Sequence, residues 1–321
     1  MTRQAPTLSS IYENDSKFGW LDTVSEQAQH NVHRLFRASA VGMKIKSVLN
    51  GTPFRHRMHP AIIIVPLGAW TTAVVFDALE GMSSGEDRLS YRKGADASVA
   101  LGLVGALPAT VTGLADWVDL YDHRRRVGMA HALLNSAAWL CFSGSLALRV
   151  TNGDRRSAAR ALSGVGYGLV MMGGALGGDL VYTLGVNVPH TTYPKPPNEF
   201  TDVLASDELV EGAPVVIEVE RVPVLLVRHG ETIHAVDAWC PHAGGPLGDG
   251  TFDGDVVECP WHQSRFCLKD GKPLQGPAAT PLRTFDVREE AGRISVSPSY
   301  EGQSWPPPPD PPASGPKTIQ A

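Results

Sequence analysis

The sequence predicts a multidomain protein, α followed by β: a four-helix transmembrane bundle and then a small antiparallel β domain. Two observations predict this fold class. Four long uncharged runs lie between residues 60 and 190, and short apolar runs rich in β-branched residues alternate with turns between residues 214 and 297. Averages over all 321 residues, 43% hydrophobic with a net charge of -5, hide this division because they combine unlike parts.

Residues 1–58 form the first predicted segment, which is polar and carries eight Lys or Arg against four Asp or Glu. Apolar residues recur at helical spacing, at Leu21, Val24, Ala28, Val32 and Leu35. This pattern predicts an amphipathic helix at a membrane surface. The segment does not begin with a basic stretch followed by a short apolar one, so we expect no cleavable signal peptide.

Residues 59–190 form the predicted membrane domain. Its uncharged runs contain 17, 19, 22 and 18 residues and cover 60–76, 97–115, 127–148 and 161–178. A helix of about 20 residues crosses a hydrocarbon core of about 30 Å. Buried helices of a soluble protein are the alternative, but four such runs in a row, each ended by charges, favour transmembrane helices. The sequence therefore predicts an integral membrane protein.

Polar residues gather at the helix ends that share a membrane face with the C-terminal domain. The candidate membrane site consists of His59, Asp116, His131, Asn135 and Asp179. Ionisable groups at membrane depth are costly and therefore candidates for function. Interhelical hydrogen bonding is one interpretation of this set; a haem between two histidines, a metal ion and a quinone head group are the others. At the opposite face, Asp77 and Asp96 border a loop, and no special role is expected for them.

Residues 191–198 are predicted to form a Pro-rich linker, which would span about 25 Å if extended. Residues 199–298 form the predicted β domain. Residues 299–321 form a Pro-rich tail that is predicted to be disordered. Five strands are predicted, at 214–220, 223–228, 232–238, 282–288 and 293–297. Residues 200–298 carry 16 Asp or Glu and 8 Lys or Arg. This acidic balance excludes nucleic acid as the expected partner and favours a redox partner protein with a basic docking face.

The β domain contains two short Cys/His motifs, Cys240-Pro-His242 and Cys259-Pro-Trp-His262. Two thiolates suit one iron of a [2Fe-2S] cluster, and two neutral imidazoles on the other iron make the cluster easier to reduce than an all-thiolate one. Each motif supplies one Cys and one His, so two loops can hold the cluster from two sides. The pattern therefore predicts cluster ligation by Cys240, His242, Cys259 and His262.

Other interpretations of these residues remain open. Two cysteines and two histidines also suit structural zinc, although zinc fingers usually pair Cys with Cys and His with His. A disulfide between Cys240 and Cys259 is a further alternative, but no sequence feature indicates secretion. Cys267 is a spare thiol rather than a fifth ligand, because four residues complete the set.

On these motifs the chain resembles the Rieske [2Fe-2S] ferredoxins over about residues 199–297, in the stretches CPHAGGPLGDG, CPWHQSRFCLKDG and GPAATPL. The resemblance implies that the two cysteines bind the buried iron and the two histidines the outer iron. The membrane half resembles an uncharacterised bacterial four-helix membrane domain, in HPAIIIVPLGAW, GALPATVTGLADW and HALLNSAAW. That second resemblance implies architecture and no activity. It also implies the bacterial plasma membrane as the location of the protein.

Departures from the Rieske pattern indicate which kind of Rieske centre to expect. Quinol-oxidising Rieske proteins carry an extra cysteine in each loop, joined as a disulfide, where this chain has Gly245 and Trp261. Their tyrosine near the cluster corresponds to Phe266, whereas Ser264 is kept. Fewer hydrogen bonds to the sulfurs lower the reduction potential. The sequence therefore predicts a low-potential, ferredoxin-like centre.

These features indicate an electron-transfer component rather than a self-contained enzyme. It would carry single electrons, and a quinone, haem or metal site in the membrane domain is the candidate for exchanging them. The alternative is a redox sensor or assembly protein whose cluster state controls partner docking. An oxygenase needs a further domain with two His and one carboxylate on iron, which is not expected here. Basic residues near the helix ends number eight against seven, and Arg34 and Arg37 favour a cytoplasmic β domain.

Overall fold

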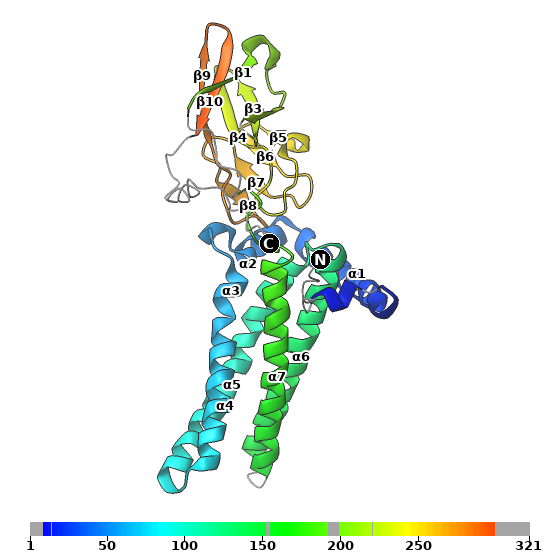
Figure 1. Ribbon diagram of the computed structural model, residues 1–321, viewed down its shortest axis with the longest axis vertical. Helices are drawn as coiled ribbons and strands as arrows, with labels where there is room; N and C mark the ends of the chain where they lie inside the picture. The colour runs from blue at the N-terminus through cyan, green and yellow to red at the C-terminus, as the bar shows by residue number, and fades with distance from the viewer. Residues whose placement is uncertain (1–8, 14, 152–154, 192–198, 220, 299–321) are drawn as a thin grey trace, which may run out of the picture.

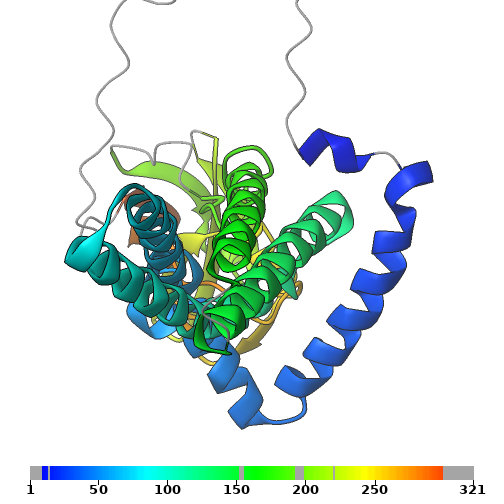
Figure 2. The same ribbon diagram turned by 90° about the horizontal axis from the view of Figure 1, so that it is seen from below.

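The computed structural model describes residues 9–13, 15–151, 155–191, 199–219 and 221–298. Helices and strands occupy separate halves, and the β domain stands on one end of a bundle of long helices (Figure 1). The N-terminal helix α1 (Asp15–Arg37) lies beside the bundle, as Figure 2 shows in a view of the molecule from below. The fold class predicted from the sequence, membrane-length helices followed by antiparallel sheets, is confirmed.

Among the described residues, four helical segments are long and apolar enough to cross a membrane. The first consists of α3 (Met58–Ile62) and α4 (Ile64–Met82), and the others are α5 (Gly85–Trp117), α6 (Asp122–Thr151) and α7 (Arg156–Tyr182). Each contains one of the predicted uncharged runs and continues past it into charged sequence. The 33 residues of α5 make a helix about 50 Å long, so its charged first turns can extend beyond the hydrocarbon core.

Small residues let the helices approach in the interior of the bundle. Trp70 of α4 stacks on Phe142 of α6 with ring centres 4.4 Å apart and planes at 4°. A Cβ atom on Gly102 of α5 would lie 2.3 Å from the Trp70 indole nitrogen, and one on Gly166 of α7 would lie 3.0 Å from the Phe142 ring. Glycine is therefore required on both helices that flank this aromatic pair.

The N-terminal segment packs against the end of the bundle nearest the β domain. It contains η1 (Ser9–Glu13), α1, α2 (Ala40–Asn50) and η2 (Thr52–Phe54). The predicted amphipathic helix exists as α1, but of its predicted apolar stripe only Leu21 is buried, while Leu35 is 75% exposed. Leu21 packs against Trp117 and Met129, and polar contacts add to this packing. The Gln29 amide donates hydrogen bonds of 3.0 and 2.9 Å to the carbonyls of Trp117 and Leu120.

The described β domain contains three antiparallel sheets, ordered β1-β10-β9, β2-β3-β4 and β5-β6-β7-β8. The strands are β1 (Thr201–Ala205), β2 (Val215–Val219), β3 (Val222–His229), β4 (Thr232–Asp237), β5 (Thr251–Asp253), β6 (Val256–Glu258), β7 (Arg265–Cys267), β8 (Pro273–Gln275), β9 (Phe285–Glu290) and β10 (Arg293–Pro298). The five predicted strands correspond to β2, β3, β4, β9 and β10. The sheet of β5 to β8 was not predicted, because strands of three residues are too short to show alternation.

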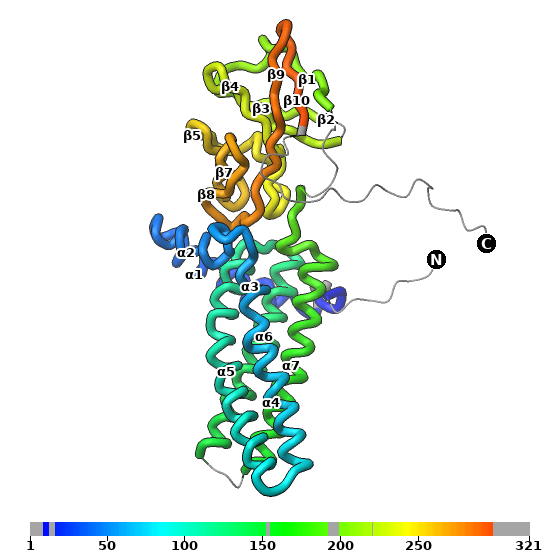
Figure 3. The backbone as a smooth tube through the Cα atoms, turned by 90° about the vertical axis from the view of Figure 1, so that its left-hand side faces the viewer, coloured from blue at the N-terminus to red at the C-terminus, as the bar shows by residue number. Residues whose placement is uncertain are grey.

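The sheet of β5 to β8 lies at the end of the β domain closest to the helices, above α2 (Figures 1 and 3). Its core includes Leu225, Leu247 and Phe266, and Cys240 and Cys259 belong to the same buried cluster. The two motif cysteines therefore sit at the inner edge of a close-packed core. Of the predicted linker only Thr191 is described, and the predicted tail lies outside the described residues.

Candidate functional site

The two Cys/His motifs form two loops with the same backbone pattern. Cys240 follows β4, and Cys259 lies between β6 and β7. In each loop the Cys amide donates to the carbonyl five residues later (2.8 Å to both Gly245 and Ser264), and the Cys carbonyl accepts from the amide four residues later. The fourth residue after each Cys has positive φ, 76° at Gly244 and 62° at Gln263. The loops are thus matched turns that differ in the spacing between Cys and His.

The two thiols contact each other at the inner side of these loops. Cys240 and Cys259 are free cysteines, each 1% exposed. The hydrogen bond between them raises the pKa of Cys240 well above its usual value and lowers the pKa of Cys259 to about 7. Backbone amides also point at the sulfurs, those of His242 and Ala243 at Cys240 and those of Trp261 and His262 at Cys259. Such amides stabilise thiolate, the form that binds iron.

The two imidazoles face each other on the other side of the loops. The Nδ1 atoms of His242 and His262 are 3.2 Å apart, and the side chains are 6% and 5% exposed. Burial lowers the pKa of both rings, so both are neutral at pH 7, as metal ligation requires. A tetrahedral metal ion with imidazole bonds of about 2.1 Å holds two nitrogens about 3.4 Å apart. The facing nitrogens therefore suit a shared metal ion.

The four donors form two separate pairs rather than one convergent set. Within the part of the chain that the structure describes, three His, Cys, Asp or Glu donors converge at one place only, and that place does not include these loops. Four ligands of a single zinc ion would all lie within about 4 Å of one another. A thiol pair and an imidazole pair set apart suit two metal ions, one with sulfur and one with nitrogen ligands. The residues therefore fit a mixed-ligand binuclear cluster.

The first loop leaves no room for a side chain at Gly245, one of the two positions where quinol-oxidising proteins carry an extra cysteine. A Cβ atom on Gly245 would lie 2.7 Å from the Cys259 sulfur and 3.3 Å from the Trp261 ring. Cys267 points elsewhere, because its side chain is hydrogen-bonded to Asp270. Phe266 is fully buried, and the Ser264 hydroxyl accepts a hydrogen bond of 3.0 Å from the Ala278 amide.

The imidazole side of the site is pressed against the helical half of the molecule. Tyr121, between α5 and α6, stacks on His262 with ring centres 5.4 Å apart and planes at 30°. The amide of His190, after α7, donates to the carbonyl of Pro241 at 3.2 Å. Both histidine loops are therefore covered by segments that connect or follow the membrane-length helices.

The proline-containing loop between β8 and β9 is docked on the same surface. The Ser47 hydroxyl accepts from the Gly276 amide at 2.9 Å. The Arg57 guanidinium donates to the Pro277 carbonyl at 2.8 Å, and the Thr52 hydroxyl donates to the Ala278 carbonyl at 2.9 Å. Three consecutive backbone positions of one loop thus bond to three side chains of the N-terminal segment. Sequence reasoning missed Ser47, Thr52 and Arg57, because nothing in a local pattern relates them to residues 220 positions later.

The structure brings together only part of the candidate membrane site. His59 and His131 have ring centres 6.4 Å apart, and the Asn135 amide is 3.4 Å from the His131 Nε2. Asp116 is occupied elsewhere: its two oxygens accept from Asn50 at 2.6 Å and Asn187 at 2.9 Å.

Asp179, the remaining member of the candidate membrane site, accepts a hydrogen bond of 2.7 Å from the Ser9 amide. Both carboxylates therefore fasten terminal segments to the bundle, and neither joins the histidines.

At the far end of the bundle the expectation for Asp77 and Asp96 was wrong. Asp77 is 6% exposed, and both residues pair with Arg149, whose guanidinium is 2.8 Å from Asp96. Arg156 pairs with Asp96 and, at 2.6 Å, with Glu80. Sequence reasoning treated these residues as markers of helix ends, because the partners are brought together only by the bundle.

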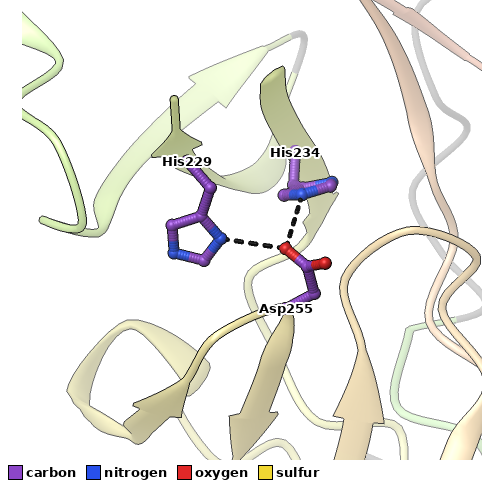
Figure 4. A group of neighbouring side chains, drawn as sticks. All are labelled: His229, His234 and Asp255. Atoms are coloured by element: carbon purple, nitrogen blue, oxygen red, sulfur yellow. Dashed lines mark hydrogen bonds and ion pairs between the residues drawn. The ribbon is translucent and has the colours of Figure 1, made fainter. Parts of the chain in front are cut away.

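A three-residue group on the outer part of the β domain was also missed. The Asp255 carboxylate contacts His229 Nδ1 and His234 Nε2 at 3.1 Å each (Figure 4). Two histidines and one carboxylate can bind a metal ion, and their donor atoms lie within 4.8 Å of one another. However, the second Asp255 oxygen pairs with Lys269 at 2.7 Å, so the carboxylate is already compensated by a cation.

Comparison with known proteins agrees with this geometry. Residues 199–286 match the Rieske [2Fe-2S] domain, and residues 55–190 match a family described as predicted membrane protein (DUF2231). Over 96 residues the chain is 35% identical to the ferredoxin component of biphenyl 2,3-dioxygenase from Rhodococcus jostii (strain RHA1), a match that covers 30% of this chain and 90% of that ferredoxin.

Two further relatives have similar coverage. The ferredoxin component of an alkene monooxygenase system from Xanthobacter autotrophicus is 37% identical over 100 residues, which are 30% of this chain and 80% of that protein. Among solved structures, the ferredoxin of carbazole 1,9a-dioxygenase from Nocardioides aromaticivorans IC177 is 32% identical and matches 32% of this chain and 100% of its own, with a TM-score of 0.31.

Fold and site together define an iron–sulfur electron carrier with a membrane domain. The chain belongs to the Rieske family and carries a [2Fe-2S] cluster in its C-terminal half. Both resemblances seen in the sequence, the Rieske half and the membrane half, are confirmed.

Proposed function

We propose that Cys240, His242, Cys259 and His262 are the four cluster ligands, and that this membrane-anchored protein carries single electrons at low potential. The separation of a buried thiol pair from a facing imidazole pair supports the ligand assignment. Bound there, the cluster supplies a one-electron redox couple. The protein's part is to hold the imidazoles neutral, direct amides at the sulfurs and keep water away from both pairs.

The low potential follows from what surrounds the sulfurs. Phe266 brings no hydroxyl to this side of the loops, and Ser264 is the hydroxyl that remains. Hydrogen bonds to cluster sulfurs raise the potential by stabilising the extra negative charge of the reduced state. With Phe in place of Tyr, the centre is expected at the lower end of the Rieske range.

One observation supports a proposal about where the electrons go: the imidazole side of the site faces the membrane domain. His242 and His262 are almost fully buried, and Tyr121, Ser47, Thr52 and Arg57 hold the loops in that orientation. Electrons cross protein only over short distances, so the partner closest to the cluster is the one that exchanges them. We infer that the carrier exchanges electrons with an acceptor in its own membrane domain.

A soluble donor is the second partner in this proposal. The ferredoxin relatives are named as components of oxygenase systems. A soluble reductase is the class of protein expected as the donor, whereas a soluble oxygenase would be an alternative acceptor. The acidic surface of the β domain suits a donor with a basic docking face. We place the β domain on the cytoplasmic side; labelling of a surface cysteine with a membrane-impermeant reagent in intact cells locates it.

The ligand and potential proposals are tested by redox titration of the full-length protein in detergent, followed by electron paramagnetic resonance. A midpoint well above about 0 mV contradicts a low-potential centre, because Rieske potentials span about -150 to +300 mV. His262→Cys should keep a cluster and lower its midpoint, since thiolate adds negative charge. The matched control is Cys267→Ser, which should leave the midpoint unchanged.

An unchanged midpoint in His262→Cys would show that His262 is not a ligand. Stopped-flow kinetics and binding measurements with the partner, in both oxidation states, separate a carrier from a redox sensor. A carrier is reduced and reoxidised rapidly by its partner, whereas a sensor changes its binding to the partner with oxidation state.

A further inference from the structure

His59 and His131 in the membrane domain are each fastened by one ring nitrogen to a neighbouring helix. Nδ1 of His59, on α3, is 2.9 Å from the Ala109 carbonyl of α5. Nδ1 of His131, on α6, is 2.7 Å from the Gly173 carbonyl of α7. A carbonyl oxygen only accepts, so each Nδ1 carries the proton and each Nε2 has a lone pair that can bind a metal ion. Metal-binding histidines are held in this manner, by donation from their other nitrogen to a carbonyl.

The same arrangement occurs twice, once in each helical hairpin. Four residues after Ala109 comes Gly113, where a Cβ atom would lie 2.9 Å from the His59 ring. Four residues after Gly173 comes Gly177, where a Cβ atom would lie 3.2 Å from the His131 ring. A His on the first helix of a hairpin thus rests against a carbonyl and a glycine on the second. This repeat presents one oriented imidazole from each hairpin to the space between them.

The separation and angle of the two rings match axial ligands of one metal ion. Their centres are 6.4 Å apart and their planes make an angle of 81°. A ring nitrogen lies about 1.1 Å from the ring centre, so bonds of about 2.0–2.1 Å place the centres of two opposed imidazoles about 6.3 Å apart. Perpendicular planes allow both rings to point along one axis from opposite sides. The observed pair therefore has the spacing of two opposed ligands.

The protein supplies no further donors for a bare ion at this position. Among the described residues, no third His, Cys, Asp or Glu converges on the pair. The Asn135 amide is 3.4 Å from the His131 Nε2 but makes a shorter bond, of 2.8 Å, to the His131 carbonyl. A metal ion held by two opposed imidazoles needs its remaining ligands in the plane between them. A porphyrin supplies these four nitrogens, and histidine is a common axial ligand of haem iron.

We propose that His59 and His131 are the two axial ligands of a haem bound between the helical hairpins. The haem is held without covalent attachment, because the chain contains no Cys-x-x-Cys-His sequence. Its place is close to the Rieske domain: Arg57, which donates to the Pro277 carbonyl, precedes His59 by two residues. Haem binding stands on the histidine geometry alone, whereas its role as the acceptor rests on the function proposed above.

In that role the haem changes by one electron between ferric and ferrous iron, matching the single electron that a Rieske centre carries. No bond breaks and no proton moves in such an exchange. The pairing accounts for two features that otherwise have no common purpose. These are a cluster domain docked with its imidazoles toward the membrane domain and an oriented imidazole pair just inside that domain.

The test is absorption spectroscopy of full-length protein purified in detergent and titrated with haemin. We expect a Soret band, the sharp α band of low-spin six-coordinate haem after reduction, and about one haem per chain in the pyridine haemochrome assay. His59→Gln and His131→Gln should each abolish the low-spin spectrum. Glutamine can still donate to the Ala109 or Gly173 carbonyl, so these variants keep the structural hydrogen bond and remove the ligand.

Two further variants serve as controls for haem ligation. His30→Gln changes an exposed histidine of α1 and should retain the full haem spectrum. His59→Ala should recover a six-coordinate spectrum when imidazole is added, which a purely structural histidine would not do. The proposal is overturned if haemin produces no Soret shift in folded protein, if bound metal is found without porphyrin, or if both glutamine variants keep the low-spin spectrum.

The Rieske signal, read separately by electron paramagnetic resonance, should persist in the histidine variants of the membrane domain. A Rieske signal without haem therefore defeats only this inference. Haem without a Rieske signal defeats only the proposed ligands and function of the β domain.

Discussion

The two ends of the helical bundle both bury polar side chains, but they use them in opposite ways. At the end far from the β domain, every membrane-length helix contributes a charged side chain to one network of ion pairs. Its members are Asp77 and Glu80 of α4, Asp96 of α5, Arg149 of α6 and Arg156 of α7. At the near end, each membrane histidine donates from Nδ1 to a carbonyl, and among the described residues only the Asn135 amide, 3.4 Å from His131 Nε2, approaches a second nitrogen.

This difference distinguishes buried polar side chains that stabilise the bundle from those that can bind a ligand. In the far network the Arg149 guanidinium is fully buried and bonds to two carboxylates and to Ser145 and Ser163. Four hydrogen bonds from one guanidinium leave it little bonding capacity for a ligand. The imidazole pair retains lone pairs that no described residue fully satisfies. A ring nitrogen that can still bind a ligand, rather than the presence of charge, therefore identifies the candidate site.

The largest effect expected from this comparison is the loss of the far network's central cation. Arg149→Met leaves Asp77 and Asp96 with one guanidinium instead of two in a poorly hydrated place. Breaking a buried ion pair by removing one partner costs about 3–5 kcal/mol. We expect the free energy of unfolding in detergent to fall by this amount, measured by helix content during titration with sodium dodecyl sulfate.

Arg160→Met is the matched control, because Arg160 lies at the same end of α7 and makes no ion pair with the described residues. It should change stability little. Equal stability of the two variants would show that the far network does not hold the bundle together. Adding Asp77→Asn to Arg149→Met should recover part of the loss, since it removes one uncompensated carboxylate.

A smaller effect is expected where the β domain meets the near end. Ser47→Ala removes the acceptor of the Gly276 amide and leaves this buried N–H unpaired. An unsatisfied buried donor costs about 1–3 kcal/mol, so exchange of this amide with solvent should accelerate about 5- to 150-fold. Hydrogen exchange with mass spectrometry on peptides that contain Gly276 measures it.

The control for docking is Ser25→Ala. Ser25 is equally buried, but its hydroxyl bonds to the Asp22 carbonyl within α1, far from Gly276 in the chain. Exchange at Gly276 should remain unchanged in this variant. If Ser47→Ala also leaves it unchanged, the docking contact contributes nothing to the orientation of the cluster loops.

The parts of the fold that the sequence predicts are those encoded locally. Each helix has its own uncharged run, and each cluster loop contains its own Cys and His within two or three positions. The backbone turns at Gly244 and Gln263 are local as well. These features need no knowledge of what lies across the fold, so the membrane-length helices and the Rieske family could be recognised from the residues alone.

The remainder depends on contacts between distant segments. In the sequence Arg156 is one of the charges that border the uncharged runs, and only the packed bundle shows that it bonds to Glu80, which is 76 positions earlier. His59 and Asp116 have similar sequence signatures, polar residues at apolar helix ends. The structure gives Asp116 two amide partners and leaves His59 with a free nitrogen. No single-sequence pattern distinguishes these outcomes, because each is set by the neighbouring helix.

The smallest predicted effect concerns the group of His229, His234 and Asp255 in the β domain. Like the near end of the bundle, this group contains two histidines. Like the far end, its carboxylate is paired with a cation, Lys269. Burial lowers the pKa of His234, so the unfolded chain takes up a proton that the folded domain resists. Stability should therefore fall as the pH drops from about 7.5 to about 5.5, through the ordinary histidine pKa of about 6.5. His234→Gln should reduce this fall in the melting temperature of the β domain, followed by the visible circular dichroism of the cluster. Thr232→Val, on the same strand, should keep the pH dependence of the unaltered protein, and an identical dependence in His234→Gln would show that His234 does not titrate with folding.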